Sequence, residues 1–177
     1  MGKARRPVQI IVLLCIVVLG AYAISSAVFG RGNDKPVVGG KPPAVKLLGL
    51  DGKVHTLDEY KGKAIVINFW ATWCTYCVNE MPALQQQWEK WRDSGVVVLG
   101  INTGEDQMTV TNFTQQLGTD FPILFDTDNE AVRDYGVVPM PTTFFVDKKG
   151  KIASIQQGEL NLKTLNEQIK RLVQTEG

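Results

Sequence analysis

The sequence predicts an α/β fold in which a helix links two parallel strands. Ala64–Trp70 (AIVINFW) is an unbroken apolar run of strand length, which is typical of a central strand covered on both faces. The segment after it carries apolar residues at helical spacing, namely Met81, Leu84, Trp88 and Trp91. A second apolar run, Val96–Asn102 (VVVLGIN), follows. Strand, helix and strand in this order form a βαβ unit, whose right-handed crossover sets the two strands side by side.

The N-terminal segment predicts one transmembrane helix. Residues 8–29 contain no charged side chain, and 22 helical residues span about 33 Å, which matches the hydrocarbon core of a bilayer. The basic residues in segment 1–7 favour a cytoplasmic N-terminus and place everything after the span outside the cytoplasm. A cleaved signal peptide is the alternative, because small residues at 21–23 and 25–27 suit a signal peptidase. Both interpretations export the rest of the chain.

Residues 30–43 predict a flexible tether, since they hold four Gly and three Pro and almost nothing apolar. The folded domain is then expected at 44–177. It opens with a β-hairpin, formed by a short strand, the turn at Asp51-Gly52 and a strand around Val54 to Leu57. The other elements follow in this order: a helix near Asp106 to Leu117, a strand at Pro122 to Phe125, a short helix near Asn129 to Tyr135, a hairpin of Thr142–Asp147 and Lys151–Gln157, and a last helix with Leu162, Leu165, Ile169 and Leu172 on one stripe.

Composition narrows the possible functions. The 177 residues carry 19 Lys plus Arg and 18 Asp plus Glu. Four of these bases and no acid lie in residues 1–31, so the rest of the chain has 15 bases and 18 acids, a formal charge of −3. This charge balance predicts that the chain does not bind nucleic acid. One His excludes sites with several His ligands, and Cys15 is too far from the other two cysteines to complete a zinc site. We therefore expect no metal or cofactor.

Two cysteines lie between the buried strand and the striped helix, in Trp73-Cys74-Thr75-Tyr76-Cys77. Cys74 falls at a helix N-terminus, where unpaired backbone N–H groups and the helix dipole stabilise a thiolate. This position predicts Cys74 as a nucleophile and Cys77, one turn later, as the resolving thiol of a pair that cycles between dithiol and disulfide. A static disulfide is the alternative in an exported protein. Because a staple that closes so short a loop stabilises little, we favour redox chemistry.

A second candidate segment lies before the last hairpin, at Met140-Pro141. This bond is a candidate cis peptide, and a cis proline facing the cysteines would leave the Met140 backbone free to hydrogen-bond an extended substrate. Taken alone, the pattern also fits a loop proline that only starts a strand. Trp73 is a candidate for the same docking surface or for the core, whereas Trp70 is expected in the core.

Several stretches together resemble the thioredoxin superfamily: WATWCTYC after a buried strand, Pro82 five positions beyond Cys77, the Met140-Pro141-Thr142-Thr143 segment and a terminal ββα order. The added N-terminal hairpin, the helix and strand inserted near 106–125 and the membrane anchor are similar to its membrane-tethered TlpA/ResA branch. The resemblance covers nearly the whole chain. It implies a thioredoxin-like fold with an added N-terminal β-hairpin and a central helix-strand insertion, preceded by one transmembrane helix.

The resemblance also implies an activity and partners. Proteins of this branch act as thiol-disulfide reductases, which keep the two haem-attachment cysteines of apocytochrome c reduced outside the membrane. They draw electrons from a membrane thiol transporter of the CcdA type. We therefore expect these two partners, contact with the lipid bilayer through residues 8–29, and a location at the cell membrane of a Gram-positive bacterium.

Two features depart from the family pattern. One is Thr75-Tyr76 between the cysteines, where many relatives have a proline in the second position; this pair tunes the redox potential. The other concerns the acid near Cys77. Asn68 replaces the buried Asp of thioredoxin, and an amide cannot take a proton from Cys77. Glu80 is the candidate acid, because it stands one helical turn after Cys77. A partly buried carboxyl there would have a raised pKa and could move the thiol proton. Members of the branch have an acid at the same offset; a surface glutamate is the alternative.

Three other functions are weighed against cytochrome maturation. A sporulation-linked sister branch has the same fold and anchor with another substrate. A copper metallochaperone shares the fold, but it would need a wider cysteine spacing and a His ligand near the proline loop. The single His of this chain is His55, in the first hairpin. A peroxiredoxin would need Thr or Ser three residues before its cysteine, where this chain has Ala71. A reductase of protein disulfides is therefore the favoured function.

Overall fold

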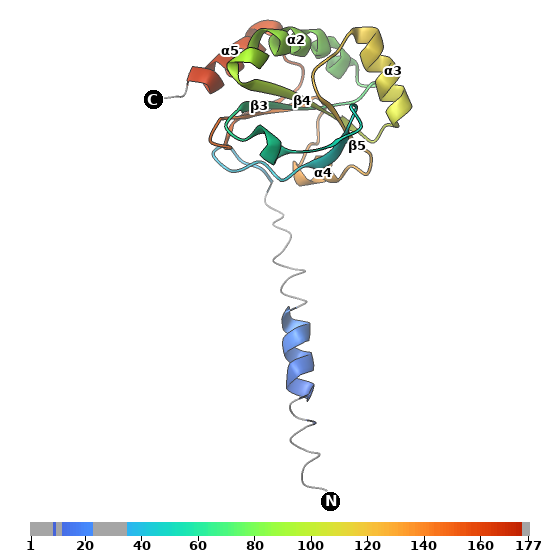
Figure 1. Cartoon of the computed structure of the whole chain (residues 1–177), viewed down its shortest axis with the longest axis vertical. Helices are drawn as coiled ribbons and strands as arrows, with labels where there is room; N and C mark the ends of the chain where they lie inside the picture. Colours follow the sequence, from blue (N-terminus) through green and yellow to red (C-terminus); the bar gives the residue numbers. More distant parts are fainter. Residues whose placement is uncertain (1–8, 10–11, 23–34, 175–177) are drawn as a thin grey trace, which may run out of the picture. The chain divides into compact units, whose positions relative to one another are not determined.

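The computed structural model describes residue 9, residues 12–22 and residues 35–174, and the chain divides into two units, Met1–Asp34 and Lys35–Gly177. In the first unit, residue 9 and residues 12–22 are helical (Figure 1). No helix among the described residues is long and apolar enough to span a membrane. The predicted span at 8–29 lies partly outside the described residues. Segment 1–7 and residues 30–34 lie wholly outside them.

The second unit is built on a seven-stranded sheet with the strand order β2-β1-β5-β4-β3-β6-β7. The strands are β1 (Lys46–Gly49), β2 (Val54–Thr56), β3 (Ala64–Trp70), β4 (Val96–Thr103), β5 (Ile123–Asp126), β6 (Thr142–Val146) and β7 (Ile152–Gln157). The α-helices are α2 (Thr75–Trp91), α3 (Gln107–Leu117), α4 (Glu130–Asp134) and α5 (Leu162–Gln174), and the 3₁₀ helices are η1 (Leu57–Tyr60) and η2 (Arg92–Ser94). β4 pairs in parallel with β3 and β5, and the other pairings are antiparallel.

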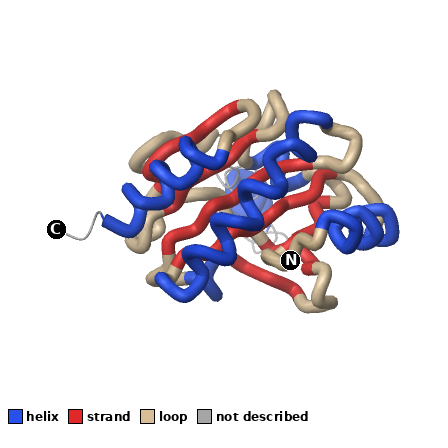
Figure 2. Tube along the Cα trace, turned by 90° about the horizontal axis from the view of Figure 1, so that it is seen from above, coloured by secondary structure: helices blue, strands red, loops and turns tan. Residues whose placement is uncertain are grey.

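Helices cover both faces of the central strand, and all seven residues of β3 are buried. Because successive side chains of a strand point to opposite faces, Val66 and Trp70 join a core formed with α2 and α5. Ile67 and Phe69 join a second core on the other face, which contains Tyr135 at the end of α4. Figure 1 shows α2 and α5 on one side of the sheet and α4 on the other, and Figure 2 shows the helices crossing the strands.

The predicted α/β class is confirmed. β3, α2 and β4 form the βαβ unit, β1 and β2 form the N-terminal hairpin, and α3 with β5 forms the inserted helix and strand. Side chains cap the N-termini of three helices. Cys74 is the N-cap of α2, Asp106 accepts from the Thr109 N–H at 3.0 Å, and Asn161 accepts from the Thr164 N–H at 2.9 Å.

The predicted tether differs from the structure over its second half. The Gly39 N–H donates to the carbonyl of Ile152 at 2.7 Å, and the Ile152 N–H donates to the carbonyl of Gly40 at 2.9 Å. The Tyr135 hydroxyl donates to the Pro43 carbonyl at 2.9 Å. Gly39 permits this turn because its φ is +86°. The compact unit therefore begins at Lys35, nine residues before the predicted boundary at Ala44.

Two smaller differences lie at the ends of elements. β2 stops at Thr56 instead of Leu57, because Thr56 and Glu59 form a capping box that starts η1. Leu162 is 41% exposed at the first position of α5, while the other three residues of its predicted stripe are buried.

Candidate active site

Cys74 and Cys77 form a disulfide at the start of α2, with their Cα atoms 5.2 Å apart. The Cys77 N–H donates to Cys74 Sγ at 3.3 Å, so a backbone donor of the first helical turn faces the first sulfur. Cys74 keeps 7% of its surface exposed and Cys77 none. The sulfur that a protein partner can reach is therefore that of Cys74, at the end of α2 that favours a thiolate.

Glu80 is buried one helical turn after Cys77, with an exposed fraction of 1%. Its Oε1 accepts from Asn68 Nδ2 at 2.6 Å, and its Oε2 accepts from the Leu160 N–H at 2.8 Å. Burial raises the pKa of Glu80 from 4.5 to about 7, with a smaller increase from Glu159, while the two hydrogen bonds lower it. A carboxyl with this pKa can gain and lose a proton near neutral pH.

Asn68 connects Glu80 to the strand that follows the proline. Asn68 and Thr143 are partners in the β3–β6 register, and Asn68 Nδ2 donates to Thr143 Oγ1 at 2.9 Å. Both donor hydrogens of the amide are thus used, and Asn68 Oδ1 is buried without a partner among the described residues. The Asn68 amide holds the Glu80 carboxyl in place, but the amide cannot itself gain or lose a proton near neutral pH.

The Met140-Pro141 peptide bond is cis, as predicted. β6 runs antiparallel to β3 with Thr142 opposite Phe69, so Pro141 lies at the end of β3 from which the chain enters the cysteine motif. The Met140 side chain packs against the core that contains Cys74 and Cys77. Within the described part of the chain, the Met140 N–H and C=O have no backbone hydrogen-bond partner. They are available to an extended peptide.

A shallow cavity of about 400 Å³ lies beside this segment. Its lining is uncharged and consists of Trp73, Thr103, Gly104, Asn129, Val132, Val137, Val138 and Met140. Trp73 is 67% exposed and Val138 is 83% exposed, whereas Trp70 is fully buried. Of the two environments predicted for Trp73, the surface and the core, the structure shows the surface. Trp70 lies in the core as expected.

Sequence analysis missed a carboxylate that holds the loop before Cys74. Glu105, just after β4, accepts from the Thr72 N–H at 2.7 Å, from the Thr72 hydroxyl and from Asn102 Nδ2 at 2.7 Å. β3 and β4 are parallel and end at the same edge of the sheet, which brings the two loops together. The sequence predicts that the loops after these two parallel strands lie close together, but it does not indicate which residue of the second loop makes the contact.

His55 lies far from this site in the sheet order. It belongs to β2, the edge strand, and its ring contacts Asp51 at 3.0 Å and Glu59 at 3.2 Å. The described residues contain no group of three His, Cys, Asp or Glu side chains arranged to hold a metal ion. The reactive groups that the site brings together are the sulfurs of Cys74 and Cys77 and the carboxyl of Glu80.

Known proteins match this chain over most of its length. The model of the AhpC/TSA family matches residues 38–155. The thiol-disulfide oxidoreductase ResA of Bacillus cereus is 32% identical over 172 residues, which are 97% of this chain and 99% of that protein. ResA of Geobacillus thermodenitrificans is 34% identical over 174 residues, again 97% and 99%. A thiol:disulfide interchange protein of the thioredoxin family from Chlorobium tepidum superposes with a TM-score of 0.71 at 26% identity, covering 77% of this chain and 98% of that structure.

Proposed function

We propose a substrate for this chain, which belongs to the AhpC/TSA family and is a ResA-type thiol-disulfide oxidoreductase with a thioredoxin-like fold. The proposed substrate is the oxidised cysteine pair of apocytochrome c, which must be reduced before haem attachment. The choice of this substrate rests on the resemblance to the TlpA/ResA branch, and the proposed reduction chemistry rests on one observation above all. A carboxyl whose pKa is about 7 lies one turn from the buried cysteine, in place to move its proton.

In the proposed reaction, reduced Cys74 attacks one sulfur of the substrate disulfide as a thiolate. A mixed disulfide forms, and the second substrate sulfur leaves as a thiolate that takes up a proton. Glu80 then accepts the Cys77 proton, and the Cys77 thiolate attacks Cys74 Sγ. The products are the Cys74–Cys77 disulfide and a fully reduced substrate, so two electrons pass from the protein to its partner. A membrane thiol donor of the CcdA type restores the dithiol.

The substrate peptide is proposed to lie along Met140. Its backbone would pair with the unpaired N–H and C=O there, beside the exposed ring of Trp73. Because the adjoining cavity has no charged lining residue, it favours a neutral side chain next to the substrate cysteine. A charged substrate side chain next to that cysteine would have to stay in the solvent, outside the cavity.

The proposal includes an extracytoplasmic domain anchored through residues 8–29, with residues 1–7 in the cytoplasm. The absence of charge over that segment and the basic residues before it support this arrangement. Anchoring would raise the effective concentration of the domain near its membrane partners.

The test is a deletion strain scored for covalent haem in c-type cytochromes and, separately, for spore formation. We expect loss of the cytochromes, rescue by the wild-type gene, and no rescue by the Cys74→Ser/Cys77→Ser variant. An added thiol reductant should also restore the cytochromes, because it replaces the missing electrons. Normal cytochromes with defective spores would contradict the proposed substrate and favour the sporulation-linked one.

A further inference from the structure

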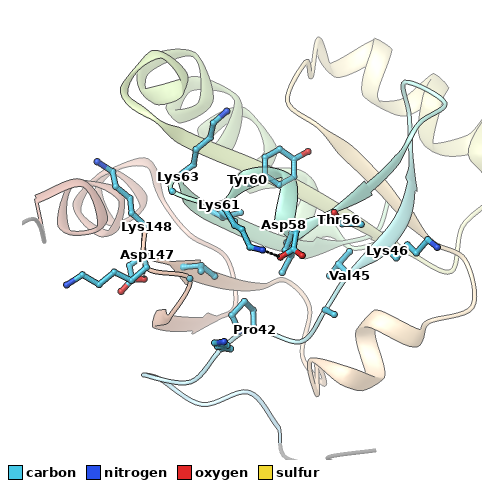
Figure 3. A pocket seen from close by; sticks show the side chains of 18 residues that line it. Pro42, Val45, Lys46, Thr56, Asp58, Tyr60, Lys61, Lys63, Asp147 and Lys148 are labelled. Atoms are coloured by element: carbon cyan, nitrogen blue, oxygen red, sulfur yellow. Dashed lines mark hydrogen bonds and ion pairs between the residues drawn. The ribbon is translucent and has the colours of Figure 1, made fainter. Parts of the chain in front are cut away.

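A cavity of about 640 Å³ (Figure 3) lies beside the start of β3, at the end of this strand opposite the cysteine motif. Its lining comes from residues 41–46, 56–65 and 146–150. Ile65, the second residue of β3, lines the cavity, and the seven-residue strand runs from there toward the cysteine motif. At about 3.3 Å per residue, the cavity and Cys74 are therefore separated by roughly 20 Å. Nothing in the proposed reaction uses this cavity.

The cavity has an apolar base and a basic rim. Apolar lining comes from Pro42, Val45, Leu57, Ile65 and Val146. Six lysines also line it, namely Lys41, Lys46, Lys61, Lys63, Lys148 and Lys149, against two acids, Asp58 and Asp147. The whole of 35–177 has 15 basic and 17 acidic residues, a formal charge of −2. The cavity therefore carries four net positive charges, and the rest of the domain carries six net negative charges.

Three of the lysines point away from the centre of the cavity, while Lys61 turns inward to Asp58. In Figure 3 the amine nitrogens of Lys46, Lys63 and Lys148 lie toward the outside of the ring of labelled residues, away from Pro42 and Val45. A compact anion is held by donors that converge on one point. Dispersed ammonium groups instead fit an extended anionic surface, to which each contributes separately.

The two acids are already engaged by neighbouring groups. Asp58 pairs with Lys61 at 3.0 Å, in an exposed contact that solvent weakens. Asp147 accepts from the backbone N–H groups of Lys149 at 2.9 Å and Lys151 at 2.8 Å, so it serves the turn between β6 and β7. Neither acid is arranged to neutralise the whole rim.

The chain enters the domain at this cavity. Gly39 and Gly40 pair with Ile152, and the next residue, Lys41, lines the cavity. Residue 29, the end of the proposed anchor, is ten residues before Gly39, and ten residues cannot span more than about 36 Å. An anchored domain can therefore bring this end to the membrane surface.

We propose that the lysine-rimmed cavity binds the phosphate headgroups of an anionic bilayer and so turns the cysteine end away from the membrane. This inference rests on the membrane location in the proposed function, because only an anchored or closely associated domain meets a bilayer. It does not depend on the identity of the substrate. In the bound orientation Cys74 and Trp73 face the aqueous phase, where the protein substrate meets them. Reduction by the membrane thiol donor then takes place when the headgroups release the cavity and the tethered domain turns.

The test uses the domain 35–177, a compact unit that contains the complete sheet and both cores. The Chlorobium tepidum structure matches 77% of this chain over 98% of its own length. Binding is measured by co-sedimentation with phosphatidylcholine vesicles that contain either no phosphatidylglycerol or 30% of it, in 50 mM salt. The test variant is Lys46→Gln/Lys63→Gln/Lys149→Gln. The control is Lys90→Gln/Lys163→Gln/Lys170→Gln, which loses the same charge from exposed positions on α2 and α5.

We expect binding only to the vesicles with phosphatidylglycerol. The test variant should lose about 100-fold in partitioning, since one lysine near an anionic surface contributes about fivefold, while the control should lose no more than about fivefold. Equal losses in both variants, or equal binding to both vesicles, would overturn the proposal. Displacement by 10 mM inorganic phosphate at constant ionic strength would also overturn it, because the cavity would then be a site for a small phosphate ligand.

Orientation and activity are measured on the same proteins. In the reduced domain, alkylation of Cys74 by a water-soluble maleimide should proceed at the same rate with and without bound vesicles; protection by the vesicles contradicts the outward orientation. Reduction of a soluble disulfide should be equal in wild type and in both lysine variants. A failure of that reduction in the wild type would refute the proposed function and leave the vesicle result intact.

Discussion

Replacing Glu80 by Gln should remove a pH dependence from the stability of the protein. The pKa of Glu80 is about 7 in the folded state, against 4.5 when it is exposed. Because the folded state holds this proton more tightly, the stabilising contribution is complete below pH 4.5 and is lost as the pH rises through 7. Integration between pH 5 and pH 8 gives a fall of about 2.5 kcal/mol in the free energy of unfolding.

The measurement is guanidinium unfolding of the oxidised protein at pH 5 and pH 8. The amide of Gln can present its oxygen to Asn68 or to the Leu160 N–H, but not to both, so the variant also carries a hydrogen-bond loss that does not itself change with pH. The difference between the two pH values isolates the ionisation. Glu89→Gln, at an exposed position on the same helix, controls for the loss of a carboxylate. A wild type and a Glu80→Gln variant with the same pH dependence would refute the buried, titrating carboxyl.

The same substitution tests the chemistry. Without a proton acceptor, release of substrate from the mixed disulfide with Cys74 should slow about 100-fold at pH 7, and the inflection near pH 7 should disappear. Single-turnover release of a fluorescent peptide disulfide measures both. An unchanged rate and an unchanged pH profile would remove Glu80 from the reaction.

Three further predictions test the nucleophile, the loop and the anchor. Cys77→Ser should accumulate a covalent complex through Cys74 on non-reducing gels of whole cells, because the resolving thiol is gone; trapping by Cys74→Ser instead would reverse the two roles. Glu105→Gln should lower the free energy of unfolding by about 1–3 kcal/mol, since one amide oxygen cannot serve the donors of Thr72 and Asn102, whereas exposed Glu167→Gln should change it little in the same denaturation assay. The full chain should remain with membranes after an alkaline wash, and a mature soluble protein beginning near residue 24 or 28 would show that the span is cleaved.

Local patterns predict most of the elements, because they depend on neighbours in the sequence. The buried run of β3 and the apolar stripe of α2 each mark their own boundaries, and Cys74 is the last of the four residues between them. The cis bond before Pro141 was also within reach, since proline is the residue that tolerates it. These local patterns therefore locate the cysteine motif and the proline segment of the site.

Contacts between distant segments could not be predicted in the same way. Glu80 meets the Leu160 N–H across 80 positions, and Glu105 meets Thr72 across 33. Neither contact leaves a periodic pattern, because each depends on where a loop ends in space. The pairing of Gly39 with Ile152 could not be predicted for another reason. Flexible linkers and tight turns that pair with a strand edge are both rich in glycine, so composition does not distinguish them.

The hydrogen bond between Leu160 and Glu80 gives the protein a built-in spectroscopic reporter. A peptide N–H that donates to a carboxyl is more strongly polarised when that carboxyl becomes charged, so its amide resonance should move downfield as Glu80 ionises. Following this one resonance in nitrogen-15-labelled protein yields the titration of Glu80 without altering any residue. Repeating the titration in the oxidised and the reduced protein shows how far the free energy of the carboxyl proton is coupled to the two electrons on the sulfurs.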